Sequence, residues 1–184
     1  MVPEKYKWLE TIGELPPLVS AGIQYLGITE VPGKGSNPAI MNMAKTIGVD
    51  NIYTDDDTSW CAVFVNFLCN ITGLPVVDPK GDKYNLLRAK WLLNWGNGVP
   101  VTEMKLGDIG VLNREGGGHV FIIIGKTPQG NVIGLGGNQG NSVSFSEFDS
   151  KRLLGIRRDN KTPLVASAKL YTVTGEGQLS NNEA

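Results

Sequence analysis

SWCAVFVNFLCNITG, residues 59–73, is the stretch on which the fold depends. Its side chains are apolar almost all the way round a helix, which is typical of a helix buried inside a domain. Thr58 or Ser59 is a candidate N-cap, and Gly73 is a natural C-terminal stop. We therefore expect this helix to be the axis around which the rest of the chain packs.

The segments on either side of this helix differ from each other in pattern. Residues 17–26, 38–47 and 86–95 have apolar side chains at helical spacing, and the first two ranges open on a proline, as helices often do. Beyond residue 100, short β-rich runs alternate with glycine turns. They predict strands near 108–113, 119–125, 131–136, 142–145 and 153–157, with 169–173 as a further candidate. Helices followed by an antiparallel sheet indicate an α+β fold.

Composition limits the classes of protein to consider. The chain has 184 residues, 41% of them apolar, which is enough to bury the core of one domain. We divide it into a lead-in at 1–15, a central domain at 16–158 and a C-terminal extension at 159–184 with a partly disordered tail.

Charge and hydropathy exclude two kinds of partner. Lys and Arg number 17 against 18 Asp and Glu, a balance that does not suit a nucleic-acid binder. No run approaches the ~18 apolar residues that cross a bilayer, so we expect no membrane insertion. We expect a monomer.

Two cysteines, Cys61 and Cys69, lie eight positions apart in the predicted central helix. That spacing corresponds to roughly 12 Å of helical rise, whereas a disulfide needs Cα atoms within about 7 Å of each other. Both are therefore expected to be free thiols. Cys61 lies in the first turn, where unpaired N–H groups and the helix dipole favour a thiolate.

The single histidine, His119, follows the residues Arg-Glu-Gly-Gly-Gly and begins the apolar run VFIII. At the mouth of a strand beside a glycine loop its ring should be accessible, which suits a general base. A half-buried structural histidine is the alternative. Together, Cys61 and His119 would form a nucleophile and its base.

A third polar group should orient the imidazole. If 119–125 and 131–137 form a hairpin, residues whose numbers sum to 257 face each other, which places Asn138 opposite His119. A slip of one residue would turn Asn138 to the other face, and Gln139 is then the alternative.

Other polar and aromatic residues near Cys61 are candidates for binding a metal ion or the substrate. The run Asp55-Asp56-Asp57 could bind calcium, but a solvated acidic loop at the start of the helix is the preferred interpretation. Trp60, next to Cys61, and Gln139 are predicted substrate contacts. We expect no metal and no cofactor, because the chain has neither C-x-x-C spacing nor a second histidine for zinc.

Seven short motifs follow one another in a recognisable order. They are EVPG at Glu30–Gly33, SNPAI at Ser36–Ile40, WCAVFVN at Trp60–Asn66, WLLNWG at Trp91–Gly96, GDI at Gly107–Ile109, GHV at Gly118–Val120 and LGGNQG at Leu135–Gly140. Over residues 16–158 this order resembles a family of phage and prophage cell-wall peptidases related to the NlpC/P60 and CHAP cysteine hydrolases.

The resemblance implies a papain-like fold of the NlpC/P60 type, with N-terminal helices packed on an antiparallel sheet. Cys61 matches the nucleophile, His119 matches the base, and Asn138 falls where the third residue of the triad is expected. The chain departs from NlpC/P60 proteins at Thr58-Ser59-Trp60, where those have an Asp-Cys-Ser setting. The departure leaves the substrate contacts open.

The activity implied is that of an endolysin-like cysteine endopeptidase that cuts the stem peptides of bacterial peptidoglycan. The alternatives are an N-acetylmuramoyl-L-alanine amidase, a non-catalytic wall-binding or virion module, and a cysteine transferase or deamidase acting on a protein. Without a recognisable signal peptide, we expect synthesis in the host cytoplasm and delivery to the wall through a holin lesion or a virus particle.

Overall fold

Helix α3 (Cys61–Ile71) lies at the centre of the molecule, and every side chain from Cys61 to Cys69 on it is buried. The predicted central helix is therefore confirmed, but its predicted cap is not. Trp60 occupies the N-cap position without a side-chain hydrogen bond. Thr58 donates its hydroxyl to Asp55 instead, and Ser59 accepts a hydrogen bond from Arg114.

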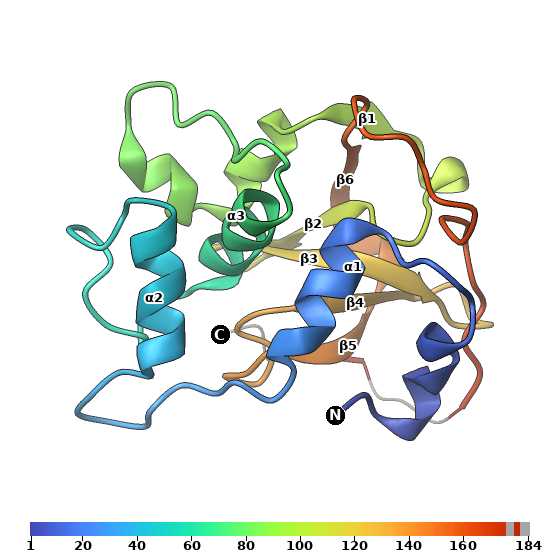
Figure 1. Ribbon diagram of the computed structural model, residues 1–184, viewed down its shortest axis with the longest axis horizontal. Coiled ribbons are helices and arrows are strands. Elements are labelled where there is room, and N and C mark those ends of the chain that lie inside the picture. Colours follow the sequence, from blue (N-terminus) through green and yellow to red (C-terminus); the bar gives the residue numbers. More distant parts are fainter. Residues whose placement is uncertain (176–178, 181–184) are drawn as a thin grey trace.

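The computed structural model describes residues 1–175 and 179–180 (Figure 1). Its other α-helices are α1 (Pro17–Gly22) and α2 (Pro38–Thr46). The strands are β1 (Asn97–Val99), β2 (Ile109–Arg114), β3 (Gly117–Lys126), β4 (Val132–Gly136), β5 (Ser144–Phe148) and β6 (Leu153–Arg158). They form one antiparallel sheet in the order β1-β6-β2-β3-β4-β5, so the predicted α+β class is confirmed.

Several short 3₁₀ turns complete the chain. They are η1 (Glu4–Glu10), η2 (Ile23–Tyr25), η3 (Lys83–Leu87), η4 (Ala89–Asn94), η5 (Val101–Glu103) and η6 (Ser150–Arg152). Predicted helices therefore appear in two places as shorter pieces: α1 with η2, and η3 with η4.

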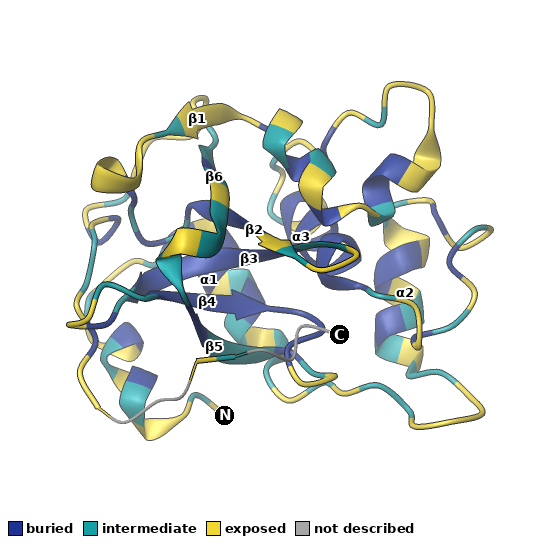
Figure 2. Cartoon of the chain, turned by 180° about the vertical axis from the view of Figure 1, so that it is seen from behind, coloured by how far each residue is buried: buried dark blue, intermediate teal, exposed yellow. Residues whose placement is uncertain are grey.

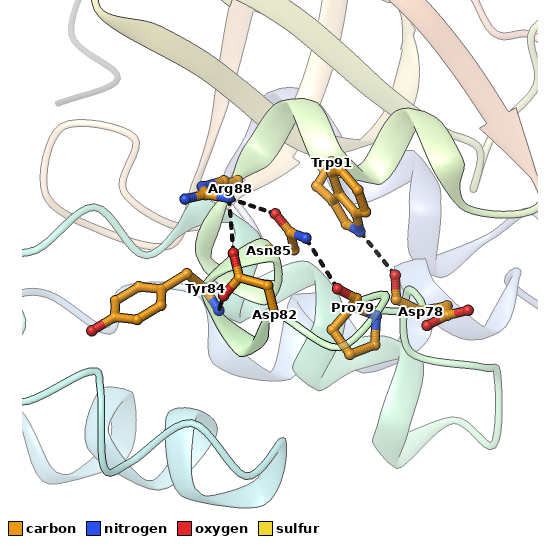
Figure 3. Close-up of polar contacts among 7 residues, drawn as sticks. All are labelled: Asp78, Pro79, Asp82, Tyr84, Asn85, Arg88 and Trp91. Atoms are coloured by element: carbon orange, nitrogen blue, oxygen red, sulfur yellow. Dashed lines mark hydrogen bonds and ion pairs between the residues drawn. The ribbon is translucent and has the colours of Figure 1, made fainter.

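Polar contacts explain why the predicted helix at 86–95 is split. Arg88 lies between η3 and η4 with an extended backbone (φ −98°, ψ 111°), which interrupts helical hydrogen bonding. Its guanidinium binds Asn85 Oδ1 at 2.6 Å and Asp82 Oδ2 at 3.2 Å (Figure 3). The Trp91 indole N–H donates to the Asp78 carbonyl at 2.8 Å (Figure 3). These hydrogen bonds hold the segment that contains η3 and η4 against the loop that precedes it.

The predicted hairpin register is confirmed in the middle of the sheet. Ile122 faces Leu135 and Ile123 faces Gly134, both pairs summing to 257, and a bulge then shifts the register by one residue. Strand β1 was not predicted, because three residues, Asn-Gly-Val, are too few to show an alternating pattern. The candidate strand at 169–173 forms only an isolated bridge, Lys126 to Thr172.

The two faces of the sheet carry separate apolar clusters. Val120, Ile122 and Ile124 of β3 share a large core with α3, whereas Phe121 and Ile123 belong to a smaller cluster on the other face. Helices α1 and α3 cover the first face, and α2 packs outside α3 (Figure 1).

The sheet is strongly curved around the smaller cluster. Five residue steps separate the end of β5 from the start of β6, and they reach about 18 Å at most. Four strand spacings in a flat sheet would need about 19 Å. Curvature brings Phe148 of β5 and Ile156 of β6 into the same cluster as Phe121.

The N-terminal end of the chain packs onto the domain. The predicted lead-in forms η1, whose Tyr6 and Leu9 are buried in the main core, and Lys5 forms an ion pair with Glu147 of β5. Most of the predicted disordered tail, residues 175–184, lies outside the described residues. In the part of the chain that is described, no helix is long and apolar enough to cross a bilayer.

Gly134 offers a test of the small cluster. A Cβ atom at this position would lie 2.1 Å from Phe121 Cδ2, so we expect Gly134→Ala to lower the free energy of unfolding by about 1–3 kcal/mol or more. Gly98→Ala, on the exposed strand β1, would meet only the end of the Arg157 side chain at 3.1 Å and is the matched control. Equal losses for both variants in urea denaturation would contradict this packing.

Candidate active site

Cys61 begins α3 and its thiol reaches strand β3. The side chain is 4% exposed. Burial is the largest influence on this thiol and raises its pKa above 9.0. The N–H of Val120 donates to the sulfur, and together with the charge of Arg114 and the N–H groups of Ala62 and Cys61 it lowers the pKa. The expected helix-terminus effect is present, but burial outweighs it, and the thiol is neutral at rest.

The contact with Val120 places the sulfur at the edge of β3. The ladder between β3 and β4 ends at the pair Ile122–Leu135, whereas β3 continues back to Gly117. A backbone N–H in a strand points along the plane of the sheet toward the neighbouring strand. The thiol therefore lies where β4 has turned away, next to the residue that carries the imidazole.

His119 projects from β3 onto the concave face of the sheet. Its ring is 0% exposed and lies 5.9 Å from the Phe121 ring and 5.4 Å from the Phe148 ring, between ring centres. The predicted accessible ring is therefore wrong for this structure. Gly117 and Gly118 belong to β3, so they form no open loop beside it.

Gln139 holds the imidazole. Its Oε1 lies 3.0 Å from His119 Nε2, while its own amide nitrogen donates to the carbonyls of Gly134 at 3.3 Å and Ser144 at 2.5 Å. Because the amide N–H groups are used in this way, Oε1 must accept from the ring, and Nε2 must carry the proton. In a neutral His119, Nδ1 is then the ring nitrogen that can accept a proton.

Asn138 does not take the role predicted for it. The register that should bring it opposite His119 ends with β4, and Asn138 adopts a left-handed backbone (φ 59°) that turns the chain. Its side chain is buried, and Oδ1 has no hydrogen-bond partner. The alternative residue, Gln139, makes the contact, and because Gln139 is itself 2% exposed it is not a substrate contact in this structure.

Trp60 is a structural residue here, and the prediction that it contacts substrate is not supported. It is completely buried, and its indole N–H donates to Glu30 Oε1 at 2.6 Å. Gly137 packs against its ring, since a Cβ there would lie 2.5 Å from the indole. The backbone N–H of Glu30 in turn donates to the carbonyl of Asn141. Three of the seven motifs thus meet around Trp60.

The acidic run matches the predicted solvated loop at exposed Asp57 and half-buried Asp55, but not at Asp56. Asp56 is completely buried, and its Oδ2 accepts from the N–H groups of Val31 at 3.1 Å and Asn37 at 2.7 Å. It fixes the loop that leads into α2. Burial, with Asp56 and Asp57 nearby, raises the pKa of Glu30. Among the residues with assigned positions, no cluster of His, Cys, Asp or Glu is suited to hold a metal ion.

Arg114 is a member of the site that the sequence did not single out. It ends β2, donates from Nη2 to Ser59 Oγ at 3.2 Å, and its charge lowers the pKa of Cys61. The signal available in the sequence was a cation five residues before His119, separated from the glycines by Glu115.

An open groove of about 340 Å³ lies at the start of β5. Its lining includes Leu26, Thr29 and Ser142–Phe145. Ser144 of this lining accepts from the Gln139 amide through its carbonyl, but Cys61, His119 and Gln139 do not line the groove.

Comparison of the chain with protein-family models and with curated proteins finds no match. The geometry of the site is therefore what supports a functional assignment. Cys61 and Cys69 are both free, as predicted.

The neutral resting state of Cys61 predicts how the thiol reacts. In Cys69→Ala protein, we expect the rate of alkylation by iodoacetamide to rise about tenfold per pH unit from pH 7 to 9, since the reactive thiolate stays a minor form. Mass spectrometry of the folded protein measures this rate. A plateau below pH 8 would show a thiolate already formed at rest and would contradict the dominance of burial.

Proposed function

We propose that this protein is a cysteine hydrolase of the papain-like type that cleaves peptide bonds in the stem peptides of peptidoglycan. The observation that carries the proposal is a helix-terminal thiol against Val120 of β3, the residue that follows a histidine whose ring is held by an amide. Each comes from a different segment of the chain: Cys61 from α3, His119 from β3, and Gln139 from the turn after β4. The order of sequence motifs supplies the substrate class.

The proposed reaction is acyl transfer through a thioester. Cys61 transfers its proton to His119 Nδ1 as the sulfur attacks the peptide carbonyl carbon, and the imidazolium then protonates the leaving amine. Water, deprotonated by His119, cleaves the thioester and restores the thiol. The N–H groups at the start of α3, which face the sulfur at rest, are placed to donate to the developing oxyanion.

Burial of the reacting groups requires movement before substrate binds. Cys61 is 4% and His119 0% exposed. The hydrogen bond from Arg114 to Ser59 links the β2–β3 hairpin to the segment before α3. Opening this contact is the proposed movement that lets substrate reach the thiol. The same burial is the observation that favours a wall-binding module as second candidate.

Loss of either reacting group tests the hydrolase. We expect Cys61→Ala and His119→Ala each to lower the release of peptides or new amino termini from purified sacculi by about 10³-fold or more, because each removes an essential reacting group. Cys69→Ala, a buried thiol away from the strand, is the matched control and should retain activity. Fragment masses also distinguish the endopeptidase from an amidase.

Other results would point elsewhere. Release of fragments by Cys61→Ala at the wild-type rate would rule out this nucleophile. If wild type releases nothing but sediments with sacculi, the wall-binding alternative replaces the hydrolase.

Gln139 and Asn138 can be told apart by kinetics. We expect Gln139→Ala to lower kcat on the order of 10²-fold, since a misplaced imidazole loses its alignment with the thiol. Asn138→Ala should lower kcat less, because Asn138 Oδ1 makes no hydrogen bond to the ring. The reverse order would restore Asn138 as the orienting residue.

A further inference from the structure

The guanidinium of Arg114 lies on the same face of the sheet as the imidazole. Directly paired residues of neighbouring strands point to one face, and Leu112 pairs with His119 while Arg114 pairs with Gly117. Arg114 and Leu112 are two positions apart on β2 and therefore share that face. Gly117 leaves room there, because a Cβ atom at Gly117 would lie 4.0 Å from Arg114 Nε. The arginine side chain can thus extend across β3 toward Ser59.

The donors of Arg114 are incompletely used. Nη2 donates to the Ser59 hydroxyl at 3.2 Å, but Nε is buried and has no acceptor. No carboxylate within residues 1–175 and 179–180 forms an ion pair with this arginine. An arginine beside a nucleophile, with a buried N–H and a positive charge both unmatched, has the chemistry of an anion receptor.

A carboxylate is the ligand that fits these donors. Its two oxygens can accept from Nε and Nη2 of one guanidinium side by side, whereas the single Ser59 hydroxyl satisfies only one of them. Ser59 is two residues before Cys61, and the charge of Arg114 acts on the Cys61 thiol. A carboxylate held at Arg114 would therefore belong to a residue next to the bond under attack.

We propose that Arg114 determines specificity by binding a free carboxylate of the substrate, so that the enzyme acts on acidic peptides and discriminates against their amidated forms. The inference rests on the proposed hydrolase and adds the chemical class of its substrate. Binding of the carboxylate would replace the bond to Ser59 and so release the hairpin from the segment that precedes the nucleophile.

The test uses two synthetic stem-type peptides that differ only in one carboxylate or carboxamide beside the scissile bond. We expect wild type to cleave the carboxylate peptide with a kcat/KM on the order of ten- to a hundredfold higher. Arg114→Gln and Arg114→Lys should lose most of this ratio, Gln because it lacks charge and Lys because it lacks the paired donors. Arg88→Gln is the matched control, since Arg88 already pairs with Asp82 and Asn85 (Figure 3).

A binding measurement separates this inference from the proposed activity. Calorimetry with Cys61→Ala should show tighter binding of the carboxylate peptide, and the added Arg114→Gln substitution should remove the difference. If wild type cleaves neither peptide, the hydrolase proposal fails. The difference in calorimetric affinity between the two peptides still tests the role of Arg114. Failure of Cys61→Ala to discriminate the two peptides overturns the inference. An Arg114→Gln variant that slows both peptides equally also overturns it, because Arg114 would then act only on the thiol.

Discussion

The edge of one buried strand, left unpaired by its neighbour, is the constraint on which this site depends. Strand β3 extends back to Gly117, whereas its pairing with β4 ends at Ile122. A buried strand edge without partners raises the free energy of the folded state, because its N–H groups lose their hydrogen bonds to water and form none in return. The start of α3 fills this place, and the Cys61 sulfur accepts from the Val120 N–H. Covering the sheet edge and positioning the Cys61 thiol therefore involve the same residues.

The remaining contacts hold the two sides of this junction together. On the helix side, Trp60 is anchored by Glu30 and covered by Gly137. On the sheet side, Gln139 fixes the imidazole against Phe121 in the curved face. Figure 2 shows β3 and β4 as largely buried strands in front of the helices. The result is a closely packed site in which the Cys61 thiol and the His119 ring are both buried.

Much of the fold could be predicted from periodicity. The apolar run from Cys61 to Cys69 identified α3. The β-rich runs between glycine turns in 109–158 identified the long strands, with the correct register at the centre of the sheet. Two kinds of feature could not be predicted. Strand β1 is too short to show a period, and the Arg88 break in 86–95 arises from tertiary hydrogen bonds to Asp82 and Asn85.

The candidate site could be predicted by residue type more easily than by geometry. Cys61 was indicated by its position in the first turn of the helix, and His119 by being the single histidine. Neither feature predicts how deeply the side chain is buried. The choice between Asn138 and Gln139 depended on where β4 stops, which the left-handed backbone of Asn138 determines. The roles of Trp60 and Arg114 depend on Glu30 and Ser59, residues 30 and 55 positions away along the chain, and no local pattern connects them.

The central claim is that Cys61, His119 and Gln139 act as one unit, and the single histidine makes it directly measurable. Nitrogen NMR of the one imidazole in folded protein should show the proton on Nε2, and Cys61→Ala should change the Nδ1 resonance while Gln139→Ala changes that of Nε2. A ring protonated on Nδ1, or an Nδ1 resonance that is unaffected by loss of the thiol, would contradict the account.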